Sequence, residues 1–417
     1  MDILNECEKI IKEGEKFGEC EIFVRHNSGN LMNIALNNVY ATSSFKDLEI
    51  CFRIFIDKKE GIVLANSFNE DIVKRAVKIC KISKEKEFYG LPERNKLKYR
   101  DVDKNIENFE FENLKEIFEI FDKNVNLSEG IISSGISKSI ILNSNGVECE
   151  REISYLTSSG ICNTDSSTVI DEKAERKYFD IKNFFENLKI NALKSRNPKK
   201  LEEIPKSIIF NQETFSHLIS LFLESFNAYS VDKGESILKG KINEKIGNLN
   251  IDIIDDPYKE NGVNSTNFDD EGCITKKNIL MENGILKNYA YDWTMAKKFN
   301  VEPTGEAVRY ESLIPEIGFH NIIIDKKEKV KEIFDEVNKG IYICSVMGMH
   351  TADSITTEFS LKVERSFYIE KGKMIPLKPF IINGKFIDLN IIAIDKNFEN
   401  RSGVYVPNVL CENLKIS

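Results

Sequence analysis

The segment Asn211–Gly234 reads NQETFSHLISLFLESFNAYSVDKG and opens the second half of the chain. Its apolar residues recur at helical spacing and predict one buried stripe, made of Phe215, Leu218, Ile219, Phe222 and Phe226. A row of polar residues falls on the opposite side of the same helix, made of Glu213, His217, Ser220 and Glu224. Such a row could be a metal site, an acid/base site or an ordinary solvated face.

Length and charge bound the rest of the chain. At 417 residues, two or three domains are expected, and a hydrophobic content of 41% with 27 phenylalanines can bury sizeable cores. The 58 Lys and Arg residues against 67 Asp and Glu give a net charge of −9. An acidic surface repels phosphate groups, so we expect no direct binding to nucleic acid or to an anionic membrane.

The nine cysteines are spread singly, and none forms a CxxC pair. The N-terminus, MDILNECEKIIKEG, predicts an amphipathic helix rather than a signal peptide. No apolar run approaches the roughly 18–20 residues that cross a bilayer. These features predict a reduced, cytoplasmic protein without a membrane segment.

The first half of the sequence alternates strand and helix patterns. Ser67–Glu70 fits a capping box that begins a helix through Cys80, and the Ser83–Glu107 stretch is interpreted as a connection. Later helices are expected at about Phe109–Asn124 and at Tyr178–Lys194. The expected strands are Glu21–His26, Leu31–Asn37, Val39–Ser44, Leu48–Ile56, Gly61–Ala65 and a group over about 130–169 with an Asn145-Gly146 turn.

The stretch Ser195–Pro205, with two prolines and clustered charge, is the best candidate domain boundary. We expect an α+β fold with a smaller N-terminal α+β domain, residues 1–198, built from subunits of about 1–82 and 108–196. A larger, predominantly antiparallel β domain is expected over 205–417. Its predicted helices are Tyr291–Phe299 and Lys326–Lys339. Its predicted strands are Ser207–Phe210, Leu249–Ile254, Asn278–Met281, Ile285–Ala290, Phe319–Asp325, Ile341–Met347, Thr357–Ile369, Met374–Ile382 and Val409–Ile416.

Motifs exclude several chemistries. No GxGxxG follows a strand, the Gly234–Lys241 stretch lacks phosphate-loop spacing, and no GxSxG is present, so no cofactor is expected. Cys344 and His350 lie six residues apart, and a core cysteine beside a loop histidine is favoured over a catalytic pair. Glu213, His217 and Glu224 could hold zinc, but a solvated row with a Glu–His ion pair is favoured.

The loop Gly348–Ser360, GMHTADSITTEFS, places small and hydroxyl residues around several polar side chains. It could bind a ligand, or its Ser and Thr residues could satisfy their own backbone. The candidates for contact with a substrate or partner are His350, Asp353, Thr357 and Glu358.

Several internal segments together resemble the PmbA/TldD family, also called modulators of DNA gyrase. They are Leu48–Ser67, Asp269-Asp270-Glu271-Gly272, Asn278–Phe299, Pro303–Ser312 and Thr356–Phe386. The resemblance spans nearly the whole chain and implies a smaller N-terminal and a larger β-rich C-terminal domain. Thr357–Ser360 departs from the Gly-Asp-Phe-Ser-like sequence that is common in the family.

The resemblance also implies where a metal site would lie. TldD-type members carry HExxxH on a helix and a cysteine near the C-terminus, whereas PmbA-type (TldE-type) members lack these ligands and pair with TldD. Counting back from Lys233-Gly234 places that motif on Ser220–Ser225, where Ser220 and Ser225 replace the histidines and Leu221 the glutamate. No cysteine stands near Arg401–Gly403, and Cys411 does not match.

We therefore expect a metal-free, PmbA/TldE-like subunit that partners a TldD-like metallopeptidase. The resemblance implies that such an assembly processes unfolded peptides, including toxin–antitoxin and microcin-type substrates. One alternative is a self-sufficient hydrolase that uses Glu213, His217 and Glu224, or Cys344 with His350. Another is a homodimeric β-rich binding protein without a peptidase role.

Overall fold

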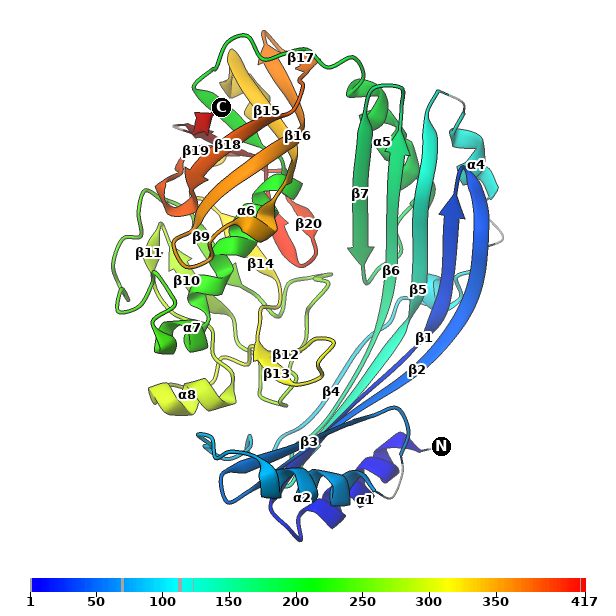
Figure 1. Ribbon diagram of the computed structural model, residues 1–417, viewed down its shortest axis with the longest axis vertical. Coiled ribbons are helices and arrows are strands. Elements are labelled where there is room, and N and C mark those ends of the chain that lie inside the picture. The colour runs from blue at the N-terminus through cyan, green and yellow to red at the C-terminus, as the bar shows by residue number, and fades with distance from the viewer. Residues whose placement is uncertain (1, 69–70, 112–114, 123, 413) are drawn as a thin grey trace.

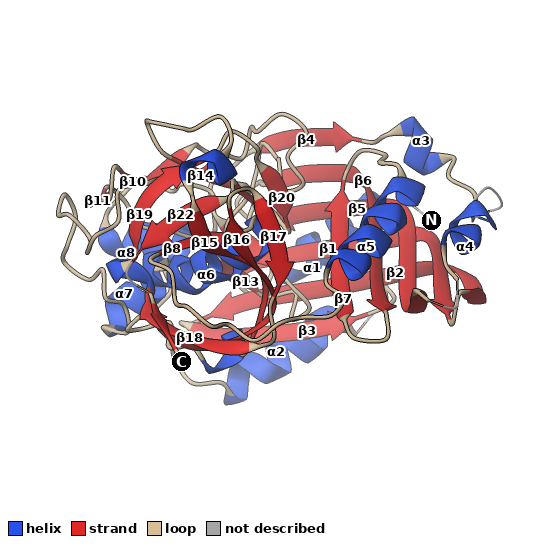
Figure 2. Ribbon diagram, turned by 90° about the horizontal axis from the view of Figure 1, so that it is seen from above, coloured by secondary structure: helices blue, strands red, loops and turns tan. Residues whose placement is uncertain are grey.

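A long, curved N-terminal sheet lies beside a more compact C-terminal half in the computed structural model (Figure 1). The structure describes residues 2–68, 71–111, 115–122, 124–412 and 414–417. Figure 2 shows the two halves side by side, with strands in both, α5 over the N-terminal sheet and α6 within the C-terminal half. The predicted α+β class is confirmed.

The N-terminal sheet has seven strands in the order β3-β2-β1-β5-β6-β4, with β7 paired to β6. Its strands are β1 Glu19–Ala35, β2 Asn38–Ile56, β3 Lys59–Ala65, β4 Lys96–Asp101, β5 Asn126–Asn143, β6 Glu148–Asn163 and β7 Thr168–Glu175. Neighbours are antiparallel except for β4 and β6, which are parallel. Because β1 pairs with β5, one sheet joins the two expected subunits.

The first strands are longer than the sequence pattern predicts. Glu21–His26 and Leu31–Asn37 belong almost entirely to β1, which is hydrogen-bonded to β2 and β5 over nearly its whole length. Leu36 and Asn37 turn the chain with φ of 49° and 60°, the left-handed geometry of a two-residue hairpin turn. The expected connection Ser83–Glu107 contains β4, whose alternating burial shows one covered face.

Helices cover both ends of this sheet (Figure 1). At one end, Cys7 of α1 packs in a core with Ile22 of β1 and Phe52 of β2, and α2 contributes to the same core. At the other end, Ile117 of α4 and Phe185 of α5 belong to a second core. The helices are α1 Ile3–Gly14, α2 Ile72–Ile82, α3 Lys104–Glu107, α4 Lys115–Ile120 and α5 Ile181–Lys194.

Two expected features of these helices fall partly on residues outside the described ones. The Ser67–Glu70 capping box includes residues 69–70, and the residue that caps α2 is Asp71. Of the helix expected at Phe109–Asn124, which includes residues 112–114 and 123, the structure describes α4.

The C-terminal half contains two larger sheets and a β12-β13 hairpin. One sheet has the order β19-β22-β8-β15-β16-β18-β23 with β17 on β16, and the other β11-β10-β9-β14-β21-β20. The pairs β8–β15 and β14–β21 are parallel and the other pairs antiparallel. The bounds are β8 Ser207–Phe210, β9 Asp252–Asp255, β10 Asn278–Glu282, β11 Ile285–Leu286, β12 Ala307–Arg309, β13 Pro315–Ile317, β14 Ile322–Asp325, β15 Lys339–Met347, β16 Glu358–Glu370, β17 Lys373–Pro376, β18 Phe380–Lys385, β19 Asn390–Ile394, β20 Glu399–Arg401, β21 Val404–Val406, β22 Val409–Glu412 and β23 Lys415–Ile416.

The central helix α6, Gln212–Leu223, packs into the core of this half. Its Phe215 and Phe222 rings pack at tilted angles against Phe386, with centroids 6.0 and 5.1 Å from the Phe386 centroid. The remaining helices are η2 Glu224–Phe226, α7 Ala228–Lys233, α8 Trp293–Phe299, η3 Ile333–Glu336, η4 Met349–Thr351 and η5 Phe386–Asp388.

The helix expected at Lys326–Lys339 was predicted wrongly, because only the short 3₁₀ turn η3 forms there. The backbone N–H of Val330 donates to Ile394 O at 2.9 Å, so this segment is bonded to the end of β19. Ile333 is buried among residues of the eight-stranded sheet. Pairing with a sheet has overridden the helical charge pattern. Within the described ranges, no helix has the length and apolarity to cross a membrane.

Candidate functional site

The helix α6 begins at a strong cap. The Thr214 N–H donates to Asn211 Oδ1 at 2.8 Å, and Asn211 Nδ2 donates to Cys344 O at 3.1 Å on β15. The predicted stripe of five apolar residues is fully buried. This anchoring fixes which polar side chains face away from the core.

Four of those polar residues, Glu213, Ser216, His217 and Ser220, line a cavity of about 540 Å³ that we call the helix cavity. Its opposite wall is Thr157–Ser159 of β6 and Ile170–Ala174 of β7, and Asn400–Ser402 close one side. The helix cavity therefore lies between the N-terminal sheet and the C-terminal half.

Burial sets the protonation of the two titratable α6 residues in this cavity. Burial raises the pKa of Glu213 to about 7, although Arg365 and Arg401 oppose the rise. Burial lowers the pKa of His217. Arg401 is held by Asp171 Oδ1 at 2.8 Å and by Glu399 Oε2 at 2.9 Å. Arg365 Nη2 lies 3.8 Å from Glu213 Oε2, so this carboxyl group already has a cation beside it.

Glu224 does not share the cavity with the other members of the predicted row. The helix α6 ends at Leu223, and Glu224 begins the 3₁₀ turn η2. Burial raises the pKa of Glu224, and the charge of Glu316 on β13 adds to the rise. Thus Glu213 and His217 lie together, and Glu224 faces another part of the molecule.

The three positions where the resemblance places the HExxxH side chains are occupied by Ser220, Leu221 and Ser225, which are poor metal ligands. The Ser220 hydroxyl donates to Ser216 O at 2.8 Å, and Leu221 offers no donor atom. The Ser225 hydroxyl is buried and donates to Ser354 O at 3.4 Å. Because zinc is bound by imidazole, thiolate or carboxylate, these side chains do not fit a zinc site.

The loop that contains His350 is stabilised by hydrogen bonds between its own side chains and its own backbone. Asp353 Oδ1 accepts from the N–H groups of Ile355 and Thr356, at 2.8 and 3.1 Å, and these bonds lower the Asp353 pKa. Thr357 is fully buried with φ of 63°, and its hydroxyl has no partner among the described residues. His350 and Glu358 are exposed. The loop thus presents His350 and Glu358 outward and holds Thr357 under strain.

Cys344 lies on β15, and burial raises its pKa to about 12. Its charged neighbours are Arg365 and Glu213. A thiol that stays protonated is a weak nucleophile. Cys411 lies inside β22 and is also fully buried.

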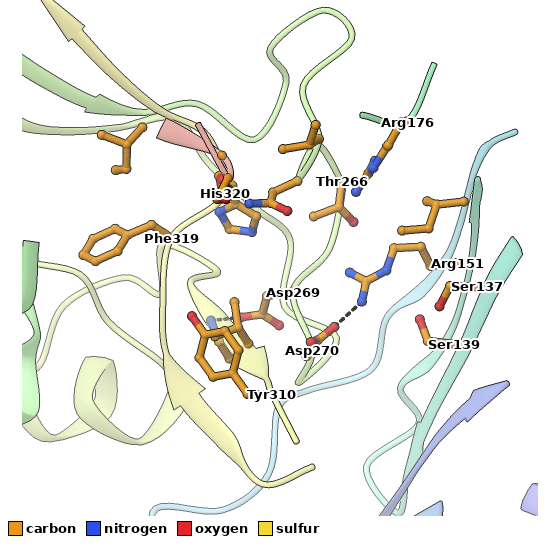
Figure 3. Close-up of a pocket in the computed structure, with 18 of the residues that line it drawn as sticks. Ser137, Ser139, Arg151, Arg176, Thr266, Asp269, Asp270, Tyr310, Phe319 and His320 are labelled. Carbon is orange, nitrogen blue, oxygen red and sulfur yellow. Dashed lines mark hydrogen bonds and ion pairs between the residues drawn. The ribbon is translucent and has the colours of Figure 1, made fainter. Parts of the chain in front are cut away.

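A second cavity, of about 520 Å³, was not predicted from the sequence; we call it the arginine cavity. It is lined by residues that include Arg25, Arg151, Arg176, Asp269, Asp270 and His320. Figure 3 shows Arg151 and Arg176 on one side, with His320, Phe319 and Tyr310 on the other. Ser402 and Val404 line both cavities, so the two meet there.

His320 is held in place by a buried carboxylate. Its Nδ1 lies 3.0 Å from Asp255 Oδ2, and Asp255 also accepts from the backbone N–H groups of His320 and Asn321. Burial would lower the His320 pKa, but Asp255 reverses this and the pKa is raised. Burial also raises the pKa of Asp269, to about 6.

Asp270 stays ionised by contrast. Burial opposes ionisation, but Arg151 and Arg309 lower the Asp270 pKa, and Arg151 bonds to Asp270 directly (Figure 3).

The Asp269–Gly272 run was the sequence signal that could have drawn attention to this cavity. Its arginines come from β1, β6 and the end of β7, far apart in sequence.

Comparisons with known proteins agree on one family. The PmbA/TldA metallopeptidase C-terminal domain matches residues 205–417, and domain 1 of the same description matches residues 20–80. An uncharacterized protein of Methanocaldococcus jannaschii is 30% identical over 97% of this chain and 98% of its own. A metalloprotease of that organism is 25% identical, over 95% of this chain and 93% of its own.

A solved structure shares the fold. TldE from Thermococcus kodakarensis superposes with a TM-score of 0.90 at 24% identity, over 99% of this chain and 100% of that one.

Proposed function

The chain belongs to the PmbA/TldD metallopeptidase family, and from this premise we propose that it is a metal-free, TldE-like subunit. In this role it acts with a TldD-like metallopeptidase in the proteolysis or maturation of unfolded peptides. The likeness to a solved TldE supports the assignment to this branch.

The observation that carries the proposal is the chemistry of α6. At the positions where the resemblance places HExxxH, Ser220 and Ser225 stand for the histidines and Leu221 for the glutamate, and Ser220 is the one of these three that lines the helix cavity. No glutamate at position 221 is available as a general base for a metal-bound water. At these positions the chain therefore lacks the side chains that zinc-dependent hydrolysis needs.

The same cavity is suited to an extended peptide. Both β7 and β20 lie at sheet edges and line it, and Asn400 Nδ2 donates to Ala174 O at 3.0 Å across them. Sheet edges present unpaired backbone groups that can bind a peptide as an added strand. This supports a role in holding the substrate rather than in cleaving it.

The proposal is tested by purifying the chain from native lysate and by reconstitution with a TldD-like subunit. We expect such a subunit to co-purify. An unfolded peptide should be hydrolysed by the two-subunit mixture and not by this chain alone.

Three results would contradict the proposal. Hydrolysis by the isolated chain, lost in Glu213→Gln or His217→Ala, would favour the self-sufficient hydrolase. Stoichiometric zinc on the isolated chain, lost in His217→Ala, would likewise overturn the metal-free assignment. Purification only as a homodimer, with no effect on a TldD-like subunit, would favour the binding protein.

A further inference from the structure

The arginine cavity contains a buried cation whose charge is poorly compensated. Arg176 is 5% exposed and lines the cavity. Its Nη1 donates to Ser265 O at 2.5 Å and to Tyr99 Oη at 3.4 Å, while Asp101 Oδ2 is 4.0 Å away. Asp101 is also bonded to Lys177. Arg176 therefore has neutral oxygens rather than a close carboxylate as its main partners.

One guanidinium hydrogen-bonding position of Arg176 is left open. Its Nε is buried and has no hydrogen-bond partner among the described residues. Burial lowers the Arg176 pKa to about 10, and the positive charge of Arg151 also lowers it, while Tyr99 and Asp101 oppose the shift. A buried, unpaired donor on a cation is costly, and an anion in the cavity would relieve that cost.

The charges around the cavity indicate what kind of anion fits. Among its described lining residues, three arginines stand against two carboxylates, Asp269 and Asp270. Arg151 is paired with Asp270. Arg25 Nη1 lies 3.5 Å from Glu49 Oε2, and its guanidinium also bonds to the backbone oxygens of Arg309 and Tyr310. Arg176, whose carboxylate neighbour Asp101 is 4.0 Å away, is thus the least compensated of the three arginines. A single cation of this kind suits a monoanion, whereas a doubly charged phosphate would be repelled by Asp270.

The rest of the lining is apolar to a large extent, with Leu223, Val263, Val308, Phe319 and Ile322 among its residues. A cavity of about 520 Å³ has the size typical of small-ligand sites, which combine apolar walls with a few fixed polar groups. The ligand should therefore carry an apolar body next to its charge.

We propose that the arginine cavity binds an amphiphilic monocarboxylate. Its carboxylate would accept hydrogen bonds from the guanidinium of Arg176, and its apolar body would pack against Leu223 and Phe319. A peptide with an apolar C-terminal residue and a small aromatic or aliphatic acid share this chemistry. The proposal rests on the residues of the arginine cavity alone, so it stands whether or not the chain partners a metallopeptidase.

The test is calorimetric binding to the full-length chain at neutral pH. The probes are the peptide Ala-Ala-Leu with a free C-terminus, the same peptide as its C-terminal amide, phenylacetate, and inorganic phosphate. A charge-assisted bond to a buried arginine should make the free acid bind at least about 10-fold more tightly than the amide. Phosphate should bind more weakly than the free acid.

Variants assign the effect to Arg176. Arg176→Gln should bind the free acid no better than the amide. The matched control is Arg196→Gln, which removes an exposed guanidinium bonded to Asp165 and should bind as wild type does. Arg176→Lys keeps the charge but lacks the planar guanidinium, so it should lower the affinity for the free acid several-fold. It replaces Arg176→Gln in the test if that variant does not fold.

Each outcome decides the question. Tighter binding of the peptide acid than of phenylacetate identifies a peptide end as the ligand, and the reverse identifies a small organic acid. Equal affinity for acid and amide, no binding of any probe, wild-type affinity in both Arg176 variants, or phosphate binding more tightly than both carboxylates would overturn the proposal.

Discussion

Replacing Glu21 by Gln should weaken the attachment between the two halves of the molecule. Glu21 lies on β1 and is 1% exposed. Its Oε1 accepts from Arg309 Nη2 at 2.6 Å, on β12, and from Arg53 Nη1 at 2.7 Å, on β2. Its Oε2 has no hydrogen-bond partner among the described residues. Glutamine can keep the accepting oxygen and place its amide nitrogen at Oε2, so the substitution removes chiefly the charge.

The size of the effect follows from the pKa of Glu21. Burial alone would raise it, but Arg309 and Arg53 lower it from 4.5 to about 2. A carboxyl group with a lowered pKa stabilises the fold fully above its unfolded pKa, and the stabilisation is lost as the pH falls through the folded pKa. The change from 4.5 to about 2 corresponds to on the order of 3 kcal/mol near neutral pH. Removing one partner of a buried ion pair typically costs about 3–5 kcal/mol.

The single tryptophan offers the assay. Trp293 Nε1 donates to Gly90 O at 3.0 Å, from α8 to the N-terminal part of the chain. Its emission should therefore report urea unfolding where the two halves meet. At about pH 7 we expect Glu21→Gln to lower the unfolding free energy by about 3 kcal/mol, and at about pH 3 by less than half of that.

The matched control is Glu8→Gln on α1. The Glu8 side chain is 43% exposed, and its Oε2 lies 3.5 Å from Lys12 Nζ, so its loss should change stability by less than about 0.5 kcal/mol. A Glu21→Gln penalty no larger than that of the control would refute the reasoning. So would a large penalty that stays constant down to about pH 3, because a charge effect must fade as the carboxylate is protonated.

Three further outcomes are expected. Asn211→Ala removes the cap of α6 and its bond to Cys344 O, and should lower the urea-unfolding free energy by about 1–2 kcal/mol. Glu213→Gln should match wild type near pH 5 and exceed its stability by on the order of 2 kcal/mol near pH 8, because burial raises the Glu213 pKa to about 7 and wild type loses stability as the pH rises through that value; equal pH profiles would contradict this. The cysteines are all buried, and burial raises the Cys344 pKa to about 12. A chromogenic thiol reagent should therefore detect no rapid reaction in the native protein and full reaction in urea.

The spacing of apolar residues predicted helices and strands correctly where a single element buries one face. The α6 stripe and the strand Ser207–Phe210 are found as predicted, since both depend on the spacing of apolar residues. The helix expected at Lys326–Lys339 failed because Val330 bonds to the end of β19, a partner distant in sequence. The separate strands expected around β1 are continuous for a similar reason, since pairing on both sides carries polar residues such as Asn27 and Ser28 into the sheet.

The sites divide in the same way. The helix cavity could be anticipated in part, because Glu213, His217 and Ser220 are placed by one helix. The arginine cavity could not, because Arg25 on β1, Arg151 on β6 and Arg176 just after β7 are remote in sequence and meet only when the sheet faces the C-terminal half. Periodicity describes one element at a time, so a site assembled from several remote elements leaves little trace in it.

The two cavities constrain one another. They meet at Ser402 and Val404, and α6 contributes Ser220 to the helix cavity and Leu223 to the arginine cavity. A peptide held by its carboxylate at Arg176 would have its preceding residues directed toward the edges of β7 and β20, which fixes its direction. Lengthening the free-acid peptide at its N-terminus should then increase affinity, whereas the same lengthening of the C-terminal amide should add much less. If affinity instead grows equally with length for acid and amide, the carboxylate is not the anchor, and the peptide lies along the sheet edges independently of the arginine cavity.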